Sequence, residues 1–247
     1  MKNQRFLVTI LFLYWSLFFI NSSYAFSGYN KARVTENGME LSMYLNLNSK
    51  IEYELNILDI EVERQFLGFG LANSIGENID AFITLNYIYG GDVELTDQLD
   101  YDGGYFTQIG TKMKVIENEK LSFFLYGQIN YLISDEFSYS DTENSAEVEN
   151  SGFELSLGGI GRFPINEQFS FFAGLELIPL SEIDADITAT EEYYGRKRTT
   201  KTSDDYDRDS IINFKLGGEY QVEKFSTSSE LSIGNEQSFS FCLNLTF

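Results

Sequence analysis

Three aspartates near the end of the chain have the spacing that comes closest to a metal site. Asp205, Asp207 and Asp209 repeat the D-x-D-x-D pattern with which a calcium-binding loop begins. Ser210 stands where that loop needs glycine, and Leu216 stands where it needs a bidentate glutamate. Because both of these positions fail, we predict no metal site here.

Two other stretches concentrate acidic residues without any lysine or arginine. Clustered carboxylates suit hard divalent cations, but such a run is more often solvated surface charge. We predict exposed, solvated segments, and divalent cation binding stays open as the alternative. The first stretch contains Asp92, Glu94, Asp97, Asp100 and Asp102, and the second contains Asp135, Glu136, Asp141, Glu143, Glu147 and Glu149.

The chain contains no histidine, so it lacks the side chain that most often takes up a proton near neutral pH. No pair among its 38 acidic residues has a spacing that sets it apart. We therefore predict a protein that is not an enzyme and holds no cofactor, although a hydrolase built on carboxylates alone stays conceivable. The net charge of −21 gives no attraction to nucleic acid, whose phosphates are also negative.

The N-terminus has the composition of a secretory signal peptide. Two basic residues precede an apolar run from Phe6 to Ile20, and small residues follow up to Ala25. The run is shorter than the roughly 18 residues that a membrane-spanning helix needs. We predict that residues 1–25 are removed after export and that residues 26–247 form one domain.

The last eleven residues, Gln237 to Phe247, alternate strictly between apolar and small polar side chains. In a strand this gives one apolar and one polar face, with the single cysteine, Cys242, on the polar face. The alternation and the final aromatic residue resemble the closing strand of bacterial outer-membrane β-barrels. That resemblance implies a signal for the barrel-assembly machinery, carried by Phe239, Phe241, Leu243, Leu245 and Phe247.

Nine earlier segments show the same alternation. Together with the last one they predict an all-β chain that forms a transmembrane, antiparallel, up-and-down β-barrel of ten strands, with eight strands as the alternative. About 22 residues per strand and connection fits strands with about 9–11 membrane residues. The segments are residues 38–53, 64–71, 81–89, 105–115, 121–133, 153–163, 169–177, 212–220, 225–233 and 237–247.

The connections between these segments fall into two classes. Every even-numbered connection is short, whereas three of the odd-numbered ones are long and polar. Short periplasmic turns and long outer loops are typical of outer-membrane barrels; a secreted soluble β-protein, the alternative, has no reason to sort its loops this way. The short connections are Ser74 to Asn78, Glu117 to Lys120, Pro164 to Gln168 and Gln221 to Lys224, and the long ones are residues 90–104, 134–151 and 180–209.

Eight charged residues fall on the polar faces of the predicted strands and should point into the lumen. Buried charges must be paired or hydrated. Small barrels are filled by side chains, while wide aqueous channels need about 16 strands, so we predict ion pairs that fill a polar core. A narrow conducting path would use the same residue types and stays open. The eight are Arg64, Lys112, Lys114, Glu154, Arg162, Glu176, Lys215 and Glu219.

The resemblance to outer-membrane barrels implies export through the secretory pathway, residence in the outer membrane, and contact with its lipid and lipopolysaccharide. Barrel enzymes of that membrane resemble one another in using a histidine base, which this chain lacks. We expect a non-enzymatic barrel with long acidic extracellular loops and a structural or surface-interaction role; a narrow channel or small-molecule transporter is the alternative. In the last long loop, Arg196, Lys197, Arg198 and Lys201 should pair with neighbouring carboxylates, or else with lipopolysaccharide phosphates.

Overall fold

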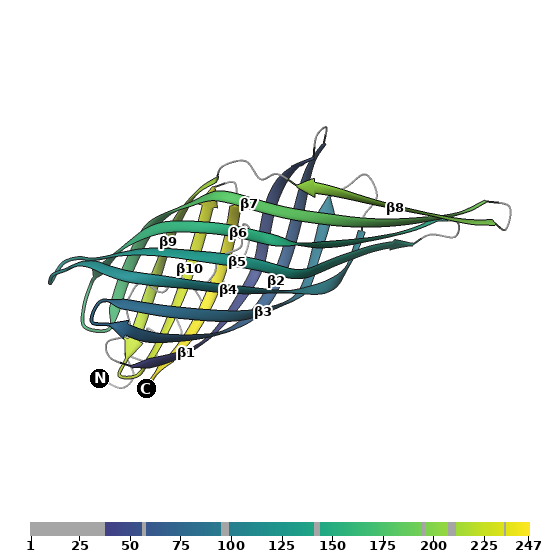
Figure 1. Cartoon of the computed structure of the whole chain (residues 1–247). Coiled ribbons are helices and arrows are strands. Elements are labelled where there is room, and N and C mark those ends of the chain that lie inside the picture. Colours follow the sequence, from purple (N-terminus) through teal and green to yellow (C-terminus); the bar gives the residue numbers. More distant parts are fainter. Residues whose placement is uncertain are drawn as a thin grey trace.

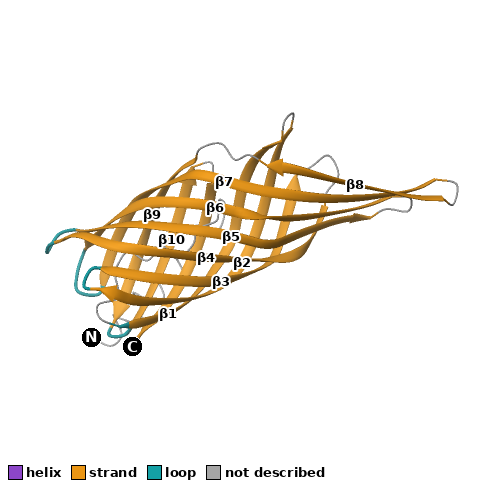
Figure 2. Ribbon diagram, viewed as in Figure 1, coloured by secondary structure: helices purple, strands orange, loops and turns teal. Residues whose placement is uncertain are grey.

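A computed structural model describes residues 38–55, 58–94, 99–140, 144–193, 196–206, 211–234 and 236–247. Among these residues, no helix is long and apolar enough to cross a membrane. The predicted signal peptide, residues 1–25, lies outside the described part of the chain. Figure 2 shows that the described residues are strands joined by short turns.

The strands form one antiparallel sheet that closes into a barrel (Figure 1). Ten strands pair in sequence order, and the last of them pairs with the first; β8 lies outside this ring and pairs with β7. The prediction of a ten-stranded antiparallel barrel is confirmed, and the eight-stranded alternative is wrong. The strands are β1 (Met39–Leu55), β2 (Leu58–Gly76), β3 (Ile79–Glu94), β4 (Leu99–Glu117), β5 (Ser122–Ser140), β6 (Asn144–Pro164), β7 (Phe169–Tyr193), β8 (Arg196–Tyr206), β9 (Ile211–Val222), β10 (Phe225–Gly234) and β11 (Glu236–Thr246).

The barrel wall has an apolar outer face and a polar inner face. In β3, Ile83 and Leu85 are 47% and 58% exposed, whereas Thr84 and Asn86 between them are 1% and 0% exposed. This arrangement is the inverse of a soluble protein, because the apolar side chains lie outside and the polar ones inside. It suits a wall that contacts hydrocarbon.

β11 closes the barrel against β1. Leu41 pairs with Leu245 and Glu40 pairs with Thr246 in this ladder. At its end the Phe247 backbone N–H donates to the Met39 carbonyl oxygen at 2.9 Å, and the Thr246 hydroxyl donates to Oε2 of the buried Glu40 at 3.1 Å. The first and last strands therefore leave no open edge between them along this ladder.

Thr246→Val is expected to weaken this closure by about 1.5–3 kcal/mol, because it leaves a buried carboxylate oxygen without its hydroxyl donor. The urea concentration at which the folded, fast-migrating gel band disappears measures the effect. Thr227→Val is the control for the change of side chain alone, because Thr227 lies half-buried on the neighbouring β10 and faces outward with its ladder partner Leu243. Equal midpoints for the two variants would contradict the assigned role of Thr246.

The long outer connections differ from the prediction. Much of each segment expected to be a polar loop instead continues the adjacent strands: β5 and β6 stay paired up to Ser140 and Ser145, and β7 stays paired up to Tyr193. Residues 196–206 form the additional strand β8. The strands continue because a backbone ladder needs no apolar outer face once the chain has left the membrane.

A bulge at Pro179 marks the place where β7 leaves the barrel wall. Leu177 pairs with Leu157 and Leu180 pairs with Leu155, so two β7 residues oppose a single β6 residue. Proline has no backbone N–H to donate, and a bulge is one of the few strand positions that tolerate it. The inward face shifts here by one residue: Ile178 is buried before the bulge, and Ser181 is buried after it.

Candidate functional site

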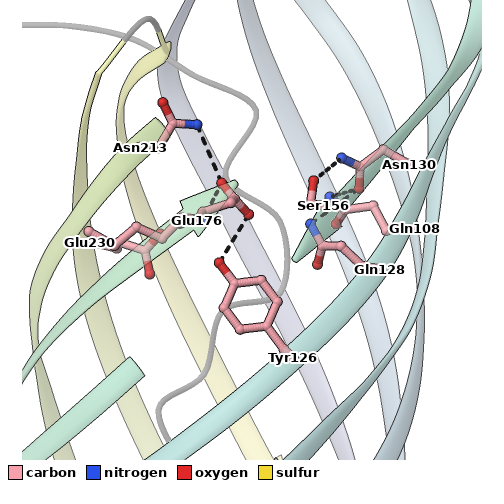
Figure 3. A network of polar contacts seen from close by, with 9 residues as sticks. Gln108, Tyr126, Gln128, Asn130, Ser156, Glu176, Asn213 and Glu230 are labelled. Atoms are coloured by element: carbon pink, nitrogen blue, oxygen red, sulfur yellow. Dashed lines mark hydrogen bonds and ion pairs between the residues drawn. The ribbon is translucent and has the colours of Figure 1, made fainter. Parts of the chain in front are cut away.

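Ionisable side chains from four strands meet inside the barrel (Figure 3). Nζ of Lys215 on β9 lies 3.0 Å from Oε2 of Glu176 on β7 and 3.6 Å from Oε1 of Glu230 on β10. The Tyr126 hydroxyl on β5 donates to Oε1 of Glu176 at 3.1 Å. Because β5 and β7 share no ladder, this cluster ties together strands that the backbone does not join.

Beside the cluster, a chain of hydrogen bonds runs across four neighbouring strands, and Figure 3 shows its part from Gln108 to Ser156. The Thr84 hydroxyl on β3 donates to Oε1 of Gln108 on β4 at 3.1 Å. The Gln108 amide donates to Asn130 of β5 at 2.9 Å, and the Asn130 amide donates to Ser156 of β6 at 3.4 Å. All four side chains are at most 2% exposed, so the lumen at this level is filled by polar groups that bond to one another.

An ion pair crosses the lumen farther toward the outer end of the strands. Nε of Arg64 on β2 donates to Oδ2 of Asp135 on β5 at 2.7 Å, and Nη2 contacts the same oxygen. Two strands, β3 and β4, separate these residues in the sheet, so the side chains meet across the interior. They are 1% and 0% exposed, and the pair is therefore closed off from solvent.

Apolar side chains pack at the same end of the interior as this ion pair. Phe66 lies two residues from Arg64, and Phe137 lies two residues from Asp135; they are 0% and 2% exposed. The ring of Phe66 meets the ring of Phe106 edge to face at 4.8 Å. Geometry of this kind adds to the stabilisation that burial alone provides. The outer end of the described interior is thus a packed layer of aromatic residues around one ion pair.

The charged residues that the sequence places in the lumen lie in two environments. Arg162 and Lys114 are less deeply placed than the others: Nε of Arg162 lies 3.0 Å from Glu219, and Nζ of Lys114 lies 2.6 Å from the exposed Glu117 beside the turn after β4. The remaining six are at most 3% exposed: Arg64, Lys112, Glu154, Glu176, Lys215 and Glu219.

Sequence reasoning missed several buried acids that complete these clusters. Asp135 was assigned to an exposed acidic loop, but it is fully buried against Arg64. Glu230 shares its strand face with Ser226 and Ser232, so alternation alone could have found it. Asp80 lies one residue beyond the start of β3 and is 2% exposed. The sequence pattern placed it between the predicted turn at Ser74 to Asn78 and a strand that begins at residue 81.

The closing strand has the orientation that its alternation predicts. Leu243 and Phe247 are 37% and 56% exposed on the outer side, while Ser238 and Asn244 are buried on the inner side. Cys242 is half-buried and its thiol donates to Oδ1 of Asn244 at 3.1 Å. The outward apolar row of the predicted assembly signal, Phe239, Phe241, Leu243, Leu245 and Phe247, continues the apolar wall of the barrel.

Within the described ranges, no group of three or more acidic or cysteine side chains is arranged to hold a metal ion. Two of the calcium-like aspartates, Asp207 and Asp209, lie outside these ranges.

No family model and no curated protein matches the sequence. Solved structures match in fold. The outer membrane protease OmpT from Escherichia coli aligns over 88% of this chain and 99% of its own, with 11% identity and a TM-score of 0.54. The protein has the fold of a bacterial outer-membrane β-barrel. This fold and the apolar outer wall support the predicted localisation in the outer membrane.

Other solved outer-membrane barrels give looser likenesses. The translocator domain of the autotransporter NalP from Neisseria meningitidis aligns over 85% of this chain and 88% of its own, with 12% identity and a TM-score of 0.47. OmpT is a protease, but an identity of 11% establishes the shared fold alone. The function must therefore be argued from the residues of this barrel.

Proposed function

We propose that the protein is a non-enzymatic outer-membrane barrel with a closed lumen and a structural or surface-interaction role. The observation that carries this proposal is the Arg64–Asp135 ion pair, which crosses the lumen and is almost completely buried. An open pore would have to pass this pair, and an aqueous path would leave its charged atoms exposed.

The deeper interior supports the same reading. Below the ion pair lie the hydrogen-bonded chain from Thr84 to Ser156 and the cluster around Lys215, both largely shielded from solvent. Small barrels are commonly filled by side chains in this way. The absence of histidine from the sequence also argues against the proton transfers on which hydrolysis usually depends.

The extracellular extensions of β5 to β8 supply the surface for interaction. Glu136, Glu149 and Asp186 are paired in register on three neighbouring strands, and all three are exposed. Like charges placed opposite each other destabilise a sheet unless water or salt screens them, so this face suits the aqueous side of the membrane. The four strands also border a hollow of about 700 Å³.

Export, assembly and lipid contact complete the proposal. Residues 1–25 direct export and residues 26–247 form the barrel domain. The outward row of β11, ending at Phe247, presents the closing strand to the assembly machinery. The apolar wall contacts membrane lipid, and the outer rim contacts lipopolysaccharide.

A narrow channel is the second candidate, because the side chains that fill the lumen are polar and a conducting path would use the same residue types. In that case the Arg64–Asp135 pair would act as a closed gate above a polar path. The two candidates differ in what happens when the pair is removed. A filled core stays closed because the polar and aromatic layers persist, whereas a gated channel opens.

Liposome swelling separates the two candidates. Vesicles carrying the refolded mature protein are expected to swell in small sugars and amino acids no faster than empty vesicles, and Arg64→Ala is expected to leave this rate unchanged. Swelling by the wild type would contradict the closed lumen. Swelling by Arg64→Ala alone would establish the gated channel instead.

A further inference from the structure

β8 has one paired edge and one open edge. It pairs with β7 from Arg196 to Tyr206; β1 also comes near it, but among the described strands no ladder forms on its other side. β9, which pairs with the lower part of β7, begins its ladder at Ile211 opposite Ile178 and does not reach this level. The backbone N–H and C=O groups along the free side of β8 therefore face away from the sheet.

This open edge runs outward from the barrel, from Tyr206 opposite Ile183 to Arg196 opposite Tyr193. From Ile178, where the ladder with β9 ends, β7 continues as a strand to Tyr193. At about 3.3 Å per residue this extension is about 50 Å long. In Figure 1 the hairpin of β7 and β8 projects well beyond the barrel. Its tip is thus presented to the surroundings of the cell rather than to lipid headgroups.

The side chains of β8 set the charge of a suitable partner. Residues 196–203 have the sequence RKRTTKTS, contain no acid, and are all exposed. Lys197 and Arg198 pair in register with Glu192 and Glu191, while Lys201 pairs with Thr188. Charged residues on an edge strand, lysine above all, discourage pairing with another strand, and only a strand of the opposite charge offsets that effect. An acidic strand would meet complementary charge here.

We propose that the open edge of β8 binds an extended, acidic polypeptide segment of an extracellular partner, which adds to the sheet as a further strand. Strand addition uses main-chain hydrogen bonds for affinity and side chains for specificity. Threonines at positions 199, 200 and 202 suit a strand. This inference rests on the proposed surface-interaction role and names the chemistry of the partner.

Peptide binding to the refolded barrel in detergent tests the proposal. The probes are three labelled ten-residue peptides in which threonine alternates with glutamate, glutamine or lysine, and a fourth glutamate peptide whose backbone is N-methylated at alternate residues. Fluorescence anisotropy should show binding of the glutamate peptide below about 1 mM. The N-methylated, glutamine and lysine peptides should each bind at least about tenfold more weakly. The N-methylated peptide lacks backbone N–H donors at alternate residues, and the glutamine and lysine peptides lack the negative charge.

Two variants of the barrel provide the matched comparison. Replacement of Arg196, Lys197, Arg198 and Lys201 by glutamine should weaken binding of the glutamate peptide at least about tenfold. Replacement of the exposed Lys120 and Lys224 by glutamine, in turns at the other end of the barrel, should leave it unchanged. The gel shift on heating verifies that each variant is folded.

Two results would overturn strand addition at β8. If the N-methylated peptide bound as tightly as its parent, the contact would be charge attraction without a shared ladder. If the glutamine variant of β8 bound as tightly as the wild type, the site would lie elsewhere. Should that variant fail to fold, the N-methylated peptide on the wild type decides alone. Failure of the glutamate peptide to bind the wild type would also overturn strand addition, but it leaves the closed lumen untouched, since liposome swelling tests that claim separately.

Discussion

Asp135→Ala is expected to lower the free energy of unfolding by about 3–5 kcal/mol, one of the two largest losses anticipated for this barrel. The substitution leaves the Arg64 guanidinium buried without the carboxylate that accepts its hydrogen bond from Nε at 2.7 Å. Removing one partner of a buried ion pair costs far more than the pair contributes when intact. Urea unfolding of the protein in lipid vesicles, followed by the gel shift, measures the change.

A double variant provides the control for this prediction. Arg64→Met with Asp135→Leu removes both charges and replaces them with apolar side chains beside Phe66 and Phe137. Such replacements of buried pairs are often neutral or stabilising, so the double variant should recover most of the loss. If Asp135→Ala unfolded at the wild-type urea concentration, the two side chains would not be buried partners.

Gly158→Ala is expected to destabilise the barrel by at least about 2 kcal/mol. A Cβ at position 158 would lie 2.4 Å from Cζ of Tyr126, whose ring lies over the glycine. Moving that ring would also break the hydrogen bond from its hydroxyl to Glu176. The same unfolding measurement in vesicles reports both effects together.

Gly70→Ala is the matched control, because Gly70 is also a strand glycine on the inner face of the barrel, beside Ser42 and Thr84. A Cβ there would lie 3.4 Å from Cγ2 of Thr84, an ordinary contact distance. This variant should unfold close to the wild-type midpoint. Equal losses for Gly158→Ala and Gly70→Ala would mean that backbone flexibility, rather than the Tyr126 ring, explains the need for glycine.

The barrel itself was predictable from the sequence because its signal is local. A strand that separates lipid from a polar lumen must alternate, and residues such as Leu85 and Asn86 show that alternation directly. The count of alternating segments then predicted ten strands, with eight as the alternative, and the sorted connection lengths agreed with a barrel. The same alternation along each strand places Arg64, Lys215 and Glu176 on the inner face.

The partners inside the lumen were not predictable in the same way. Arg64 and Asp135 are 71 residues apart and meet across the barrel, a contact that depends on the stagger of strands rather than on local pattern. Bulges add to the difficulty, since the shifts near Leu132 and Pro179 reverse which residues face inward. For this reason the sequence pattern assigned Asp135 to an exposed acidic loop instead of the lumen.

The extended outer hairpins were missed for a related reason. Beyond the membrane a strand no longer needs an apolar outer face, so residues 196–203 carry no apolar alternation that distinguishes a strand from a polar loop. Only the ladder with β7 reveals β8 as an edge. The sequence thus shows the alternating barrel wall clearly and leaves the strand extensions beyond it undetected.

The claim of a closed lumen is tested most directly by ion current across a planar lipid bilayer that contains the refolded wild-type protein. Insertion is verified by recovering protein with the heat-dependent gel shift from the same preparation. The buried Arg64–Asp135 pair and the filled interior predict a current no greater than that of the bare bilayer. Discrete, reproducible conductance steps from the folded wild-type protein would contradict the account.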